Sequence, residues 1–397
     1  MTAKKSTVLA GLSVLTLVML APAGIAAASG TAAVKHQRQA APSSRAITFT
    51  SAVAGTRSLS PATYPGWPGR FYHVAATSAN DVWAVGIGGT GGQIGHWNGR
   101  SWTDYLFSEG FQGVSARFPT DAWAVGGTGW FYPVQTLADH WNGKSWSQVP
   151  TPTPGGSAWL NAVAATWPTN AWAVGCICGG PGALGNPVPL IEHWTGRKWT
   201  VQRFQEPGDG GEFLAVSATS ARNAWAVGFS GGGATAQTLI EHWNGRRWYR
   251  LTSYAPYGEG VLQGVAAVGP DNVWTVGYSQ LTGVYQSLIL HWNGRRWHVV
   301  SSPNPTGSTN LWDVSASSRS NAWAVGYTNP NGCYCGTAAF HWNGKRWHAI
   351  PTPNPSAGFL DALLGVVAIS PSDAWAVGTT DWSSTIIEHW NGKSWQD

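Results

Sequence analysis

Charged side chains are scarce in this sequence: Asp, Glu, Lys and Arg together make up 10% of its 397 residues. Segments that combine helical hydrophobic periodicity with helix caps are absent as well. Glycine (51 residues) and tryptophan (27 residues) are abundant instead. This composition argues against a helical protein and predicts an all-β fold built from tight turns and aromatic packing.

The excess of basic over acidic residues is small. The formal net charge is +5, and Lys4 and Lys5 at the N-terminus contribute to it. Proteins that bind nucleic acid usually carry a strong basic excess. We therefore expect no nucleic-acid partner.

Long apolar runs are absent after the first residues, so no bilayer-spanning helix is expected in the body of the chain. The N-terminus itself runs from Lys4 and Lys5 through an apolar stretch to the small residues Ala26, Ala27 and Ala28. This order is typical of a secretory signal peptide, which we place at residues 1–28. Its short apolar core favours cleavage over retention as a membrane anchor.

Residues 29–62 are rich in Ala, Ser and Thr and have few large apolar side chains, which predicts a flexible spacer. Together with the signal peptide, the spacer predicts a secreted, extracellular protein with no membrane span after cleavage.

A Trp-rich repeat fills the rest of the chain. Trp-Ala-Val-Gly, once Trp-Thr-Val-Gly, recurs with its first residue at Trp83, Trp123, Trp172, Trp225, Trp274, Trp323 and Trp375. Each copy is followed by a His-Trp pair, a Gly-containing turn and another Trp, with the His at His96, His140, His193, His242, His291, His341 and His389. Self-similarity at such a period indicates a repeat architecture.

Each copy predicts four short strands, named A to D in chain order. Strand A surrounds a Val nine residues before the first Trp, strand B contains Trp-Ala-Val-Gly, strand C ends at His-Trp, and strand D begins at the last Trp. We predict that residues 63–397 form a seven-bladed β-propeller of four-stranded antiparallel blades. An open β-solenoid fits less well, because its coils are shorter and do not need a regular hairpin.

The turn between strands C and D is Asn-Gly in most copies, a signal for a two-residue type I′ hairpin. That register places Trp141 opposite Lys144 and His140 opposite Ser145, and it lets the basic side chain lie across indole rings. Thr195-Gly196 departs from the pattern. We expect the seven His and the basic turn residues to serve blade packing and a solvated rim.

These motifs resemble the repeat of tectonin-type propellers, in which a Val-Trp strand precedes a hairpin with Trp and Asn-Gly. Asp-box (BNR) and kelch propellers look similar too. The resemblance implies a propeller and suggests recognition of sugars or microbial surface polymers. It supports function only weakly, because packing motifs of this kind occur with many activities.

Fixed and variable spacings separate the two ends of the expected propeller. The A-B and C-D spacings are constant, whereas the B-C and D-A connections vary in length. Because the strands alternate in direction, the B-C and D-A connections share one face, here called the loop face, and the A-B and C-D turns share the other, the turn face. Variable loops on a rigid scaffold are where binding usually occurs.

Aromatic residues outside the repeat motif concentrate in or beside these variable connections. Their rings can stack on the apolar faces of sugars or, alternatively, pack locally to hold the connections in place. The candidate ligand-binding residues are Trp130, Phe131, Tyr132, Trp159, Tyr257, Tyr285, Trp312 and Trp382.

Two copies of strand A depart from the repeat at the residue just before the Val that all seven copies share. Most copies have Gly or Ala there, but His73 and Asp313 occupy the position in the first and sixth copies. Strand A lines the channel of a propeller, so both side chains are expected to face the channel or to bond a neighbouring strand.

The four cysteines fall in two B-C connections, as Cys176 and Cys178 and as Cys333 and Cys335. An exported chain can keep disulfides, so each pair is expected to close on itself or to stay free. A four-Cys zinc site would need connections from nearly opposite blades to meet. No metal and no cofactor are expected.

No catalytic signature stands out. Glu206, Asp209 and Glu212 cluster in one D-A connection, but a solvated loop explains them better than glycoside chemistry does. We therefore expect a non-enzymatic recognition module for an extracellular glycan or cell-wall polymer, bound at the loop face. The alternatives are a polysaccharide-active hydrolase or lyase, and a scaffold that binds a surface protein.

Overall fold

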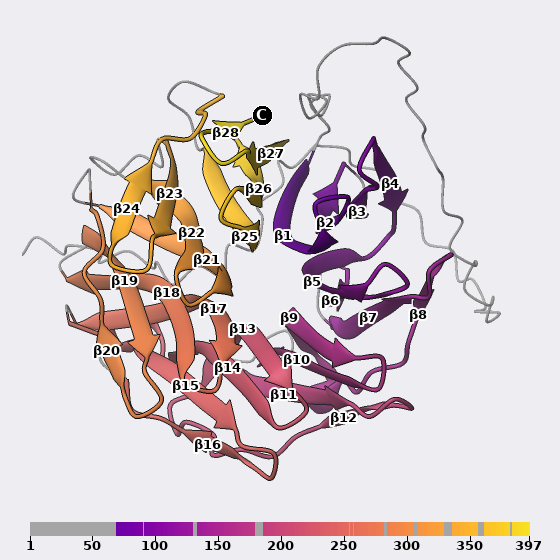
Figure 1. Ribbon diagram of the computed structural model, residues 1–397. Helices are drawn as coiled ribbons and strands as arrows, with labels where there is room; N and C mark the ends of the chain where they lie inside the picture. Colours follow the sequence, from indigo (N-terminus) through magenta and orange to yellow (C-terminus); the bar gives the residue numbers. More distant parts are fainter. Residues whose placement is uncertain are drawn as a thin grey trace, which may run out of the picture.

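The chain forms a ring of seven four-stranded antiparallel sheets around a central axis (Figure 1). The computed structural model describes residues 69–89, 91–129, 133–178, 186–253, 255–256, 258–281, 284–304, 308–328, 336–355, 361–381 and 383–397. The predicted all-β fold and the seven-bladed propeller are confirmed. The predicted signal peptide and spacer lie outside the described residues.

Each blade consists of four consecutive strands, A to D from the centre outward. The innermost strands, A, are β1 (Gly69–Ser78), β5 (Gly110–Phe118), β9 (Ala158–Trp167), β13 (Gly211–Ser220), β17 (Glu259–Gly269), β21 (Thr309–Ser318) and β25 (Ala362–Ser370). The B strands are β2 (Asp81–Gly88), β6 (Asp121–Thr128), β10 (Asn170–Ile177), β14 (Asn223–Ser230), β18 (Asn272–Leu281), β22 (Asn321–Thr328) and β26 (Asp373–Thr380).

The C strands are β3 (Gly91–Trp97), β7 (Gln135–Trp141), β11 (Val188–Trp194), β15 (Gln237–Trp243), β19 (Val284–Trp292), β23 (Gly336–Trp342) and β27 (Ser384–Trp390). The short outer strands, D, are β4 (Trp102–Leu106), β8 (Trp146–Gln148), β12 (Trp199–Val201), β16 (Trp248–Arg250), β20 (Trp297–Val299), β24 (Trp347–Ile350) and β28 (Trp395–Gln396). Two 3-10 turns, Pro154–Gly156 and Gly233–Thr235, lie in connections.

Three indole rings fill the seam between each pair of neighbouring blades. Trp225 on β14 of blade four is 0% exposed and packs 5.4 Å from Trp292 and 5.4 Å from Trp297 of blade five, the latter edge to face at 90°. The same trio occurs at every seam. Buried aromatic groups in this geometry supply both apolar burial and a preferred ring orientation.

The ring closes with the same contact. Trp375 of blade seven lies 5.7 Å from Trp97 and 5.8 Å from Trp102 of blade one. In Figure 1, β25 and β26 of the last blade accordingly lie beside β1 of the first. Among the described residues, each blade takes all its strands from one continuous stretch of chain, so closure depends on seam packing rather than on a shared sheet.

The repeat histidines, near the end of strand C, stack on the Trp of strand B and bond the first residue of that strand. His242 stacks on Trp225 with ring centroids 3.9 Å apart, and its Nε2 lies 2.7 Å from the side-chain oxygen of Asn223. In blade two the partner is a carboxylate, with His140 Nε2 2.6 Å from Asp121 Oδ1. Each blade repeats this arrangement, which explains why the His and Trp spacings are so regular.

Buried carboxylates precede several of these histidines. Glu192 and Glu241 are 0% exposed, and burial raises the pKa of each carboxyl to about 7. The Thr151 hydroxyl donates to Glu192 from the D-A connection before blade three, and Arg250 Nε donates to Glu241 across 3.3 Å. These hydrogen bonds anchor connections to blades. Burial nevertheless removes the water that would stabilise the charged form of each carboxyl.

The predicted C-D register is wrong by two residues along strand D. Trp141 pairs directly with Trp146, and His140 pairs with Ser147. The Asn142 N–H donates to the Ser145 carbonyl, and Gly143, at φ 91°, is the first of two central turn residues. The Asn142 side chain causes this, because its Oδ1 accepts the N–H groups of Lys144 and Ser145. A type II′ turn fits this pattern and type I′ does not.

The shifted register also overturns the expected contact between basic turn residues and indoles. Lys144 becomes the second central residue of the turn, where its side chain is exposed to solvent. Within the described residues, the cation-ring contacts are those of Arg70 and Arg117. The basic residues of the C-D turns are therefore exposed at the rim of the ring, where Arg346 Nε lies 3.2 Å from His348 Nε2.

Hydrogen bonds between connections confirm the two faces. On the loop face, the N–H of Ala158, which begins β9 directly after a D-A connection, donates to the Val134 carbonyl of a B-C connection over 3.0 Å. On the turn face, the Trp97 indole N–H donates to the Ala79 carbonyl of the A-B turn over 3.2 Å. Connections of variable length therefore lie side by side at one end of the ring.

Candidate binding site at the channel mouth

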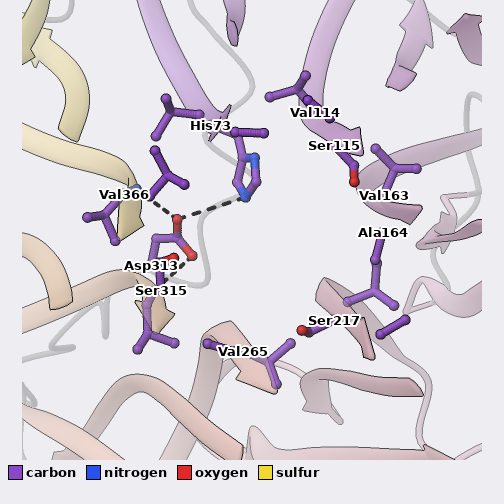
Figure 2. Close-up of a pocket in the computed structure, with 18 of the residues that line it drawn as sticks. His73, Val114, Ser115, Val163, Ala164, Ser217, Val265, Asp313, Ser315 and Val366 are labelled. Carbon is purple, nitrogen blue, oxygen red and sulfur yellow. Dashed lines mark hydrogen bonds and ion pairs between the residues drawn. The ribbon is translucent and has the colours of Figure 1, made fainter. Parts of the chain in front are cut away.

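The seven A strands surround a central cavity of about 240 Å³. Figure 2 shows side chains from these strands arranged around the opening. Most of the lining residues are Val, Ala and Ser, because strand A is close to its neighbours in the ring. An ideal Cβ at Gly113, for example, would lie 2.7 Å from Cα of Ala162 in the next blade.

Serine side chains join alternate blades inside the channel. Ser115, Ser217 and Ser315 follow the conserved Val in blades two, four and six, and each accepts a backbone N–H from the next blade at 3.0 to 3.1 Å. The other blades have Ala or Val at this position. The channel wall is therefore less uniform than the seams.

His73 and Asp313 meet across blade seven. His73 Nε2 lies 3.8 Å from Asp313 Oδ2, and the side chains are 32% and 10% exposed (Figure 2). The carboxylate also accepts the Val314 N–H at 2.8 Å and the Val366 N–H at 2.9 Å. Gly365 of blade seven occupies the same strand position between them. Because it has no side chain, the two residues can meet across this blade.

The surroundings of Asp313 perturb its ionisation. Burial raises the pKa of this carboxyl, and His73 together with the two backbone N–H groups opposes that rise. A carboxylate and an imidazole so placed offer hydrogen-bond acceptors and a donor at the wall of the cavity.

Two aromatic residues lie one position closer to the loop face. Tyr72 and Trp312 precede His73 and Asp313, each at a break in the A-B register. Both pack against a small apolar cluster with Tyr327 and Leu364. Arg70 lies 5.6 Å from the Tyr72 ring centroid. His73 and Asp313 thus line the cavity itself, and the two half-buried rings pack beside them at the loop-face end of β1 and β21 without lining it.

Trp159 and Tyr285 are not brought together with Trp312 or with each other. Trp159 on β9 covers Gly127 of blade two, and Tyr285 on β19 packs edge to face on Tyr278 at 5.0 Å. Trp312 lies 6.4 Å from Tyr327. Each of the three is half-buried in its own sector. Five further candidates lie outside the described residues: Trp130, Phe131, Tyr132, Tyr257 and Trp382.

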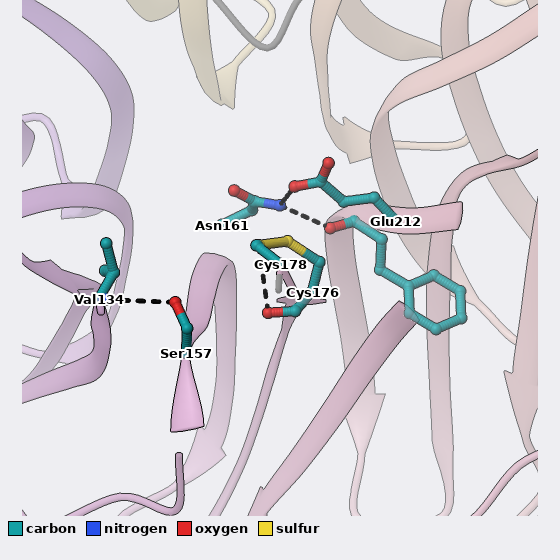
Figure 3. The surroundings of a disulfide bond; sticks show 7 residues. Val134, Ser157, Asn161, Cys176, Cys178 and Glu212 are labelled. Carbon is teal, nitrogen blue, oxygen red and sulfur yellow. Dashed lines mark hydrogen bonds between the residues drawn. A yellow bond between two sulfur atoms is a disulfide. The ribbon is translucent and has the colours of Figure 1, made fainter. Parts of the chain in front are cut away.

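Cys176 and Cys178 form a disulfide at the end of β10 (Figure 3). Close by, the Asn161 side chain donates to the Glu212 carboxylate at 2.6 Å and to the Phe213 carbonyl at 2.8 Å, which links blades three and four. Cys333 and Cys335 lie outside the described residues. The local Cys176 pairing leaves no thiol there for a metal.

Sequence reasoning identified His73 and Asp313 as unusual but missed Tyr72 and Arg70. The available signal was their position, since they flank the buried Phe71 at the start of a strand whose other copies differ there. In the described part of the chain, no cluster of three or more His, Cys, Asp or Glu is arranged to hold a metal ion. No helix in the same residues is long and apolar enough to span a membrane.

The fold and the seams define a seven-bladed β-propeller with Trp-rich blades. Among solved structures, it is similar to YCF48 bound to D1 peptide, with a TM-score of 0.52 and 15% identity over 81% of this chain and 92% of that chain. YCF48 from Cyanidioschyzon merolae gives 0.52 and 15% over 82% and 97%. The WD40 propeller domain of Doa1 gives 0.53 and 11% over 82% and 95%.

These identities are low enough that the likeness concerns the fold alone. No family model matches the chain. No curated protein sequence matches it either. The resemblance to tectonin, Asp-box and kelch repeats therefore stays a prediction.

Proposed function

We propose that this chain is a secreted, non-enzymatic recognition module that binds a glycan or cell-wall polymer at the loop face, over the channel mouth. The observation that carries the proposal is the polar pair His73 and Asp313 in the channel wall, with the half-buried rings of Tyr72 and Trp312 next to it on the loop-face side. Sugars present apolar C–H faces that stack on aromatic rings and hydroxyl groups that need hydrogen-bond partners. The four side chains offer both kinds of contact.

The architecture supports recognition rather than turnover. The seams hold the blades rigidly, while the connections of variable length meet at the loop face, which is the usual arrangement for a binding surface. The Asp313 carboxylate is engaged by two backbone N–H groups, and Glu212 accepts from Asn161. Both carboxylates are therefore engaged in hydrogen bonds that link neighbouring blades or strands.

Binding of the full chain to isolated cell-wall polysaccharide and to a panel of neutral oligosaccharides tests the proposal. Measurements at about 0.5 M salt suppress charge attraction. Trp312→Ala and His73→Ala should each weaken binding about tenfold, since each removes a stacking surface or a hydrogen-bonding group. Trp167→Ala is the matched control, because Trp167 is 56% exposed but lies on the turn face.

Three outcomes overturn the proposal. Equal losses in the Trp312 and Trp167 variants would remove the site from the channel mouth. Release of reducing sugar or unsaturated products from the polysaccharides would support a hydrolase or lyase instead. Binding that protease treatment of the cell-wall material abolishes would support a scaffold for a surface protein.

A further inference from the structure

The turn face divides into two sectors of different charge. In blades three to six, the C-D turn carries two adjacent basic residues: Arg197 and Lys198, Arg246 and Arg247, Arg295 and Arg296, and Lys345 and Arg346. In blades seven, one and two, the second of these positions is Ser394, Ser101 and Ser145. We call the turns of blades three to six the basic arc.

A second position changes in the same blades. The residue that bonds the repeat His is an aspartate in blades seven, one and two, namely Asp373, Asp81 and Asp121. In the basic arc it is an asparagine, namely Asn170, Asn223, Asn272 and Asn321. At these two positions, each of the four contiguous blades thus has one more cation and one fewer anion than blades seven, one and two. The amide and the carboxylate both bond the repeat His, so the difference in charge is not needed for that bond.

The cations of the basic arc are available to a ligand. Their side chains are exposed, and within the described residues the eight turn cations form no ion pair with an acidic side chain. Arg222 of the neighbouring A-B turn packs against Gly245, directly beside Arg246. Arg319 adds a further charge, partly offset by its ion pair with Asp271.

The basic arc is local, because the propeller as a whole has no basic excess. All acidic residues of the chain follow residue 69, whereas several basic residues precede it: Lys4, Lys5, Lys35, Arg38, Arg45 and Arg57. The small positive balance of the chain therefore comes from the N-terminal residues. A nearly neutral ring with one strongly basic sector has an oriented electrostatic field.

We propose that the basic arc binds a linear anionic polysaccharide along the rim of the turn face, separately from the loop face. Each blade presents one pair of cations, so successive blades repeat the same contact along a curve, which suits a polymer with regularly spaced anionic groups. An anionic membrane fits less well, because the four C-D turns of the basic arc contain only Asn or Thr, Gly and basic residues. Among the described residues, the turn face offers a single exposed large apolar side chain for insertion, that of Trp167 in the A-B turn of blade three.

The test compares two triple variants of the full chain with dextran sulfate, polygalacturonate and neutral dextran as probes. Arg246→Ser, Arg295→Ser and Lys345→Ser remove three cations from the basic arc. Arg100→Ser, Lys144→Ser and Lys393→Ser remove three from the same turn position in the other sector. All six residues are exposed, and none lies at the channel mouth.

We expect the basic-arc variant to lose about tenfold or more in affinity for dextran sulfate at low salt, and the control variant less than about threefold. The wild-type affinity should fall steeply with salt, and the slope should be smaller in the basic-arc variant. Polygalacturonate tests whether carboxylate groups serve as well as sulfate groups. Neutral dextran should not bind.

Equal losses in the two variants would overturn the proposal, because only bulk charge would then matter. Failure of both anionic polymers to bind would overturn it as well, as would tighter binding of duplex DNA or of anionic vesicles than of either polysaccharide. None of these results bears on the binding of neutral sugars at the loop face, so the two proposals fail independently.

Discussion

The seams between the blades and the wall of the channel follow opposite rules. At each seam the same three indoles and one imidazole recur, so that Trp225 and Trp375 have equivalent surroundings in blades four and seven. Along the channel the copies differ, with His73, Asp313 and alternate serines among small residues. A ring closes only if the rotations at its seven interfaces add up to a full turn, which equivalent packing at every seam satisfies, whereas side chains facing the channel are free of that constraint.

The comparison separates residues that set geometry from residues that can carry specificity. Identical packing at every seam leaves little room for substitution, because protein interiors are close-packed. The channel and the two faces tolerate change because they contact solvent. Variation within a repeat is thus informative where the fold does not demand uniformity.

The largest expected effect is the loss of a seam indole. Trp225→Ala removes a fully buried ring from a cluster of three and leaves a cavity, which should lower the free energy of unfolding by about 3 to 5 kcal/mol. Denaturant titration followed by tryptophan fluorescence measures the change. Trp167→Ala, at an exposed indole, should cost less than about 1 kcal/mol. Similar costs for both would contradict the role assigned to the seams.

The second largest expected change in the free energy of unfolding comes from replacing the buried carboxylate of Glu192. Burial raises the pKa of Glu192 to about 7 from its ordinary value of 4.5, so the folded state is increasingly penalised as pH rises from about 4.5 and fully penalised above about 7. The penalty disappears as pH falls and the group takes up a proton. Glu192→Gln should therefore stabilise the protein by at most about 3 kcal/mol at pH values above 8 and leave it nearly unchanged below about pH 5.

The pH range of the measurement matters, because buried histidines act in the opposite sense. Burial lowers the pKa of His242 and His291 to about 4, so their contribution is lost as pH falls from 6.5 towards 4. Unfolding measured between pH 8.5 and 6.5 isolates the carboxylates. Wild-type stability should rise as pH falls through that window, and the rise should be smaller in the Glu192 variant.

Leu290 and Phe340 occupy the equivalent position in blades five and six, so the fold does not require a carboxylate there.

The fold was predictable because its determinants are periodic. The spacings of Trp, His and Asn-Gly fix four strands, a hairpin and the blade number, and the buried Val and Phe or Leu of strand A follow at constant distances. The turn register was not predictable from Asn-Gly alone. Asn142 uses its side chain to bind turn N–H groups, and this local bond competes with the type I′ geometry that the dipeptide otherwise favours.

The candidate site was predictable only in part. His73 and Asp313 stand out as departures from a repeat, but their contact depends on closure of the ring and on the absence of a side chain at Gly365. The basic arc was visible in the sequence as paired basic residues. It acquired meaning only when the shifted turn register left those side chains exposed.

A smaller effect is expected at Gly365, where the channel wall approaches a seam. An ideal Cβ there would lie 2.8 Å from the Cα of His73, whereas blades three and four accommodate Ala162 and Ala215 at the same position. Gly365→Ala should therefore cost about 1 to 3 kcal/mol. Ala215→Gly, the reverse change, should cost about 1 kcal/mol or less. Equal midpoints of denaturation for wild type and Gly365→Ala would show that the β1 backbone at His73 can shift to accommodate the added methyl group at little cost.

The smallest effect is expected for the channel serines, where the copies already alternate. Ser217→Ala removes an acceptor for the Ala267 N–H at 3.1 Å and should cost about 0.5 to 1.5 kcal/mol, because water in the channel can replace the hydroxyl. Hydrogen exchange of the Ala267 amide should accelerate in the variant, whereas amides at the seams should not change. Blades three and five carry Ala164 and Ala266 at this position and still pack into the same ring. A loss as large as that of Trp225→Ala would mean that the channel wall, and not the seam, holds neighbouring blades together.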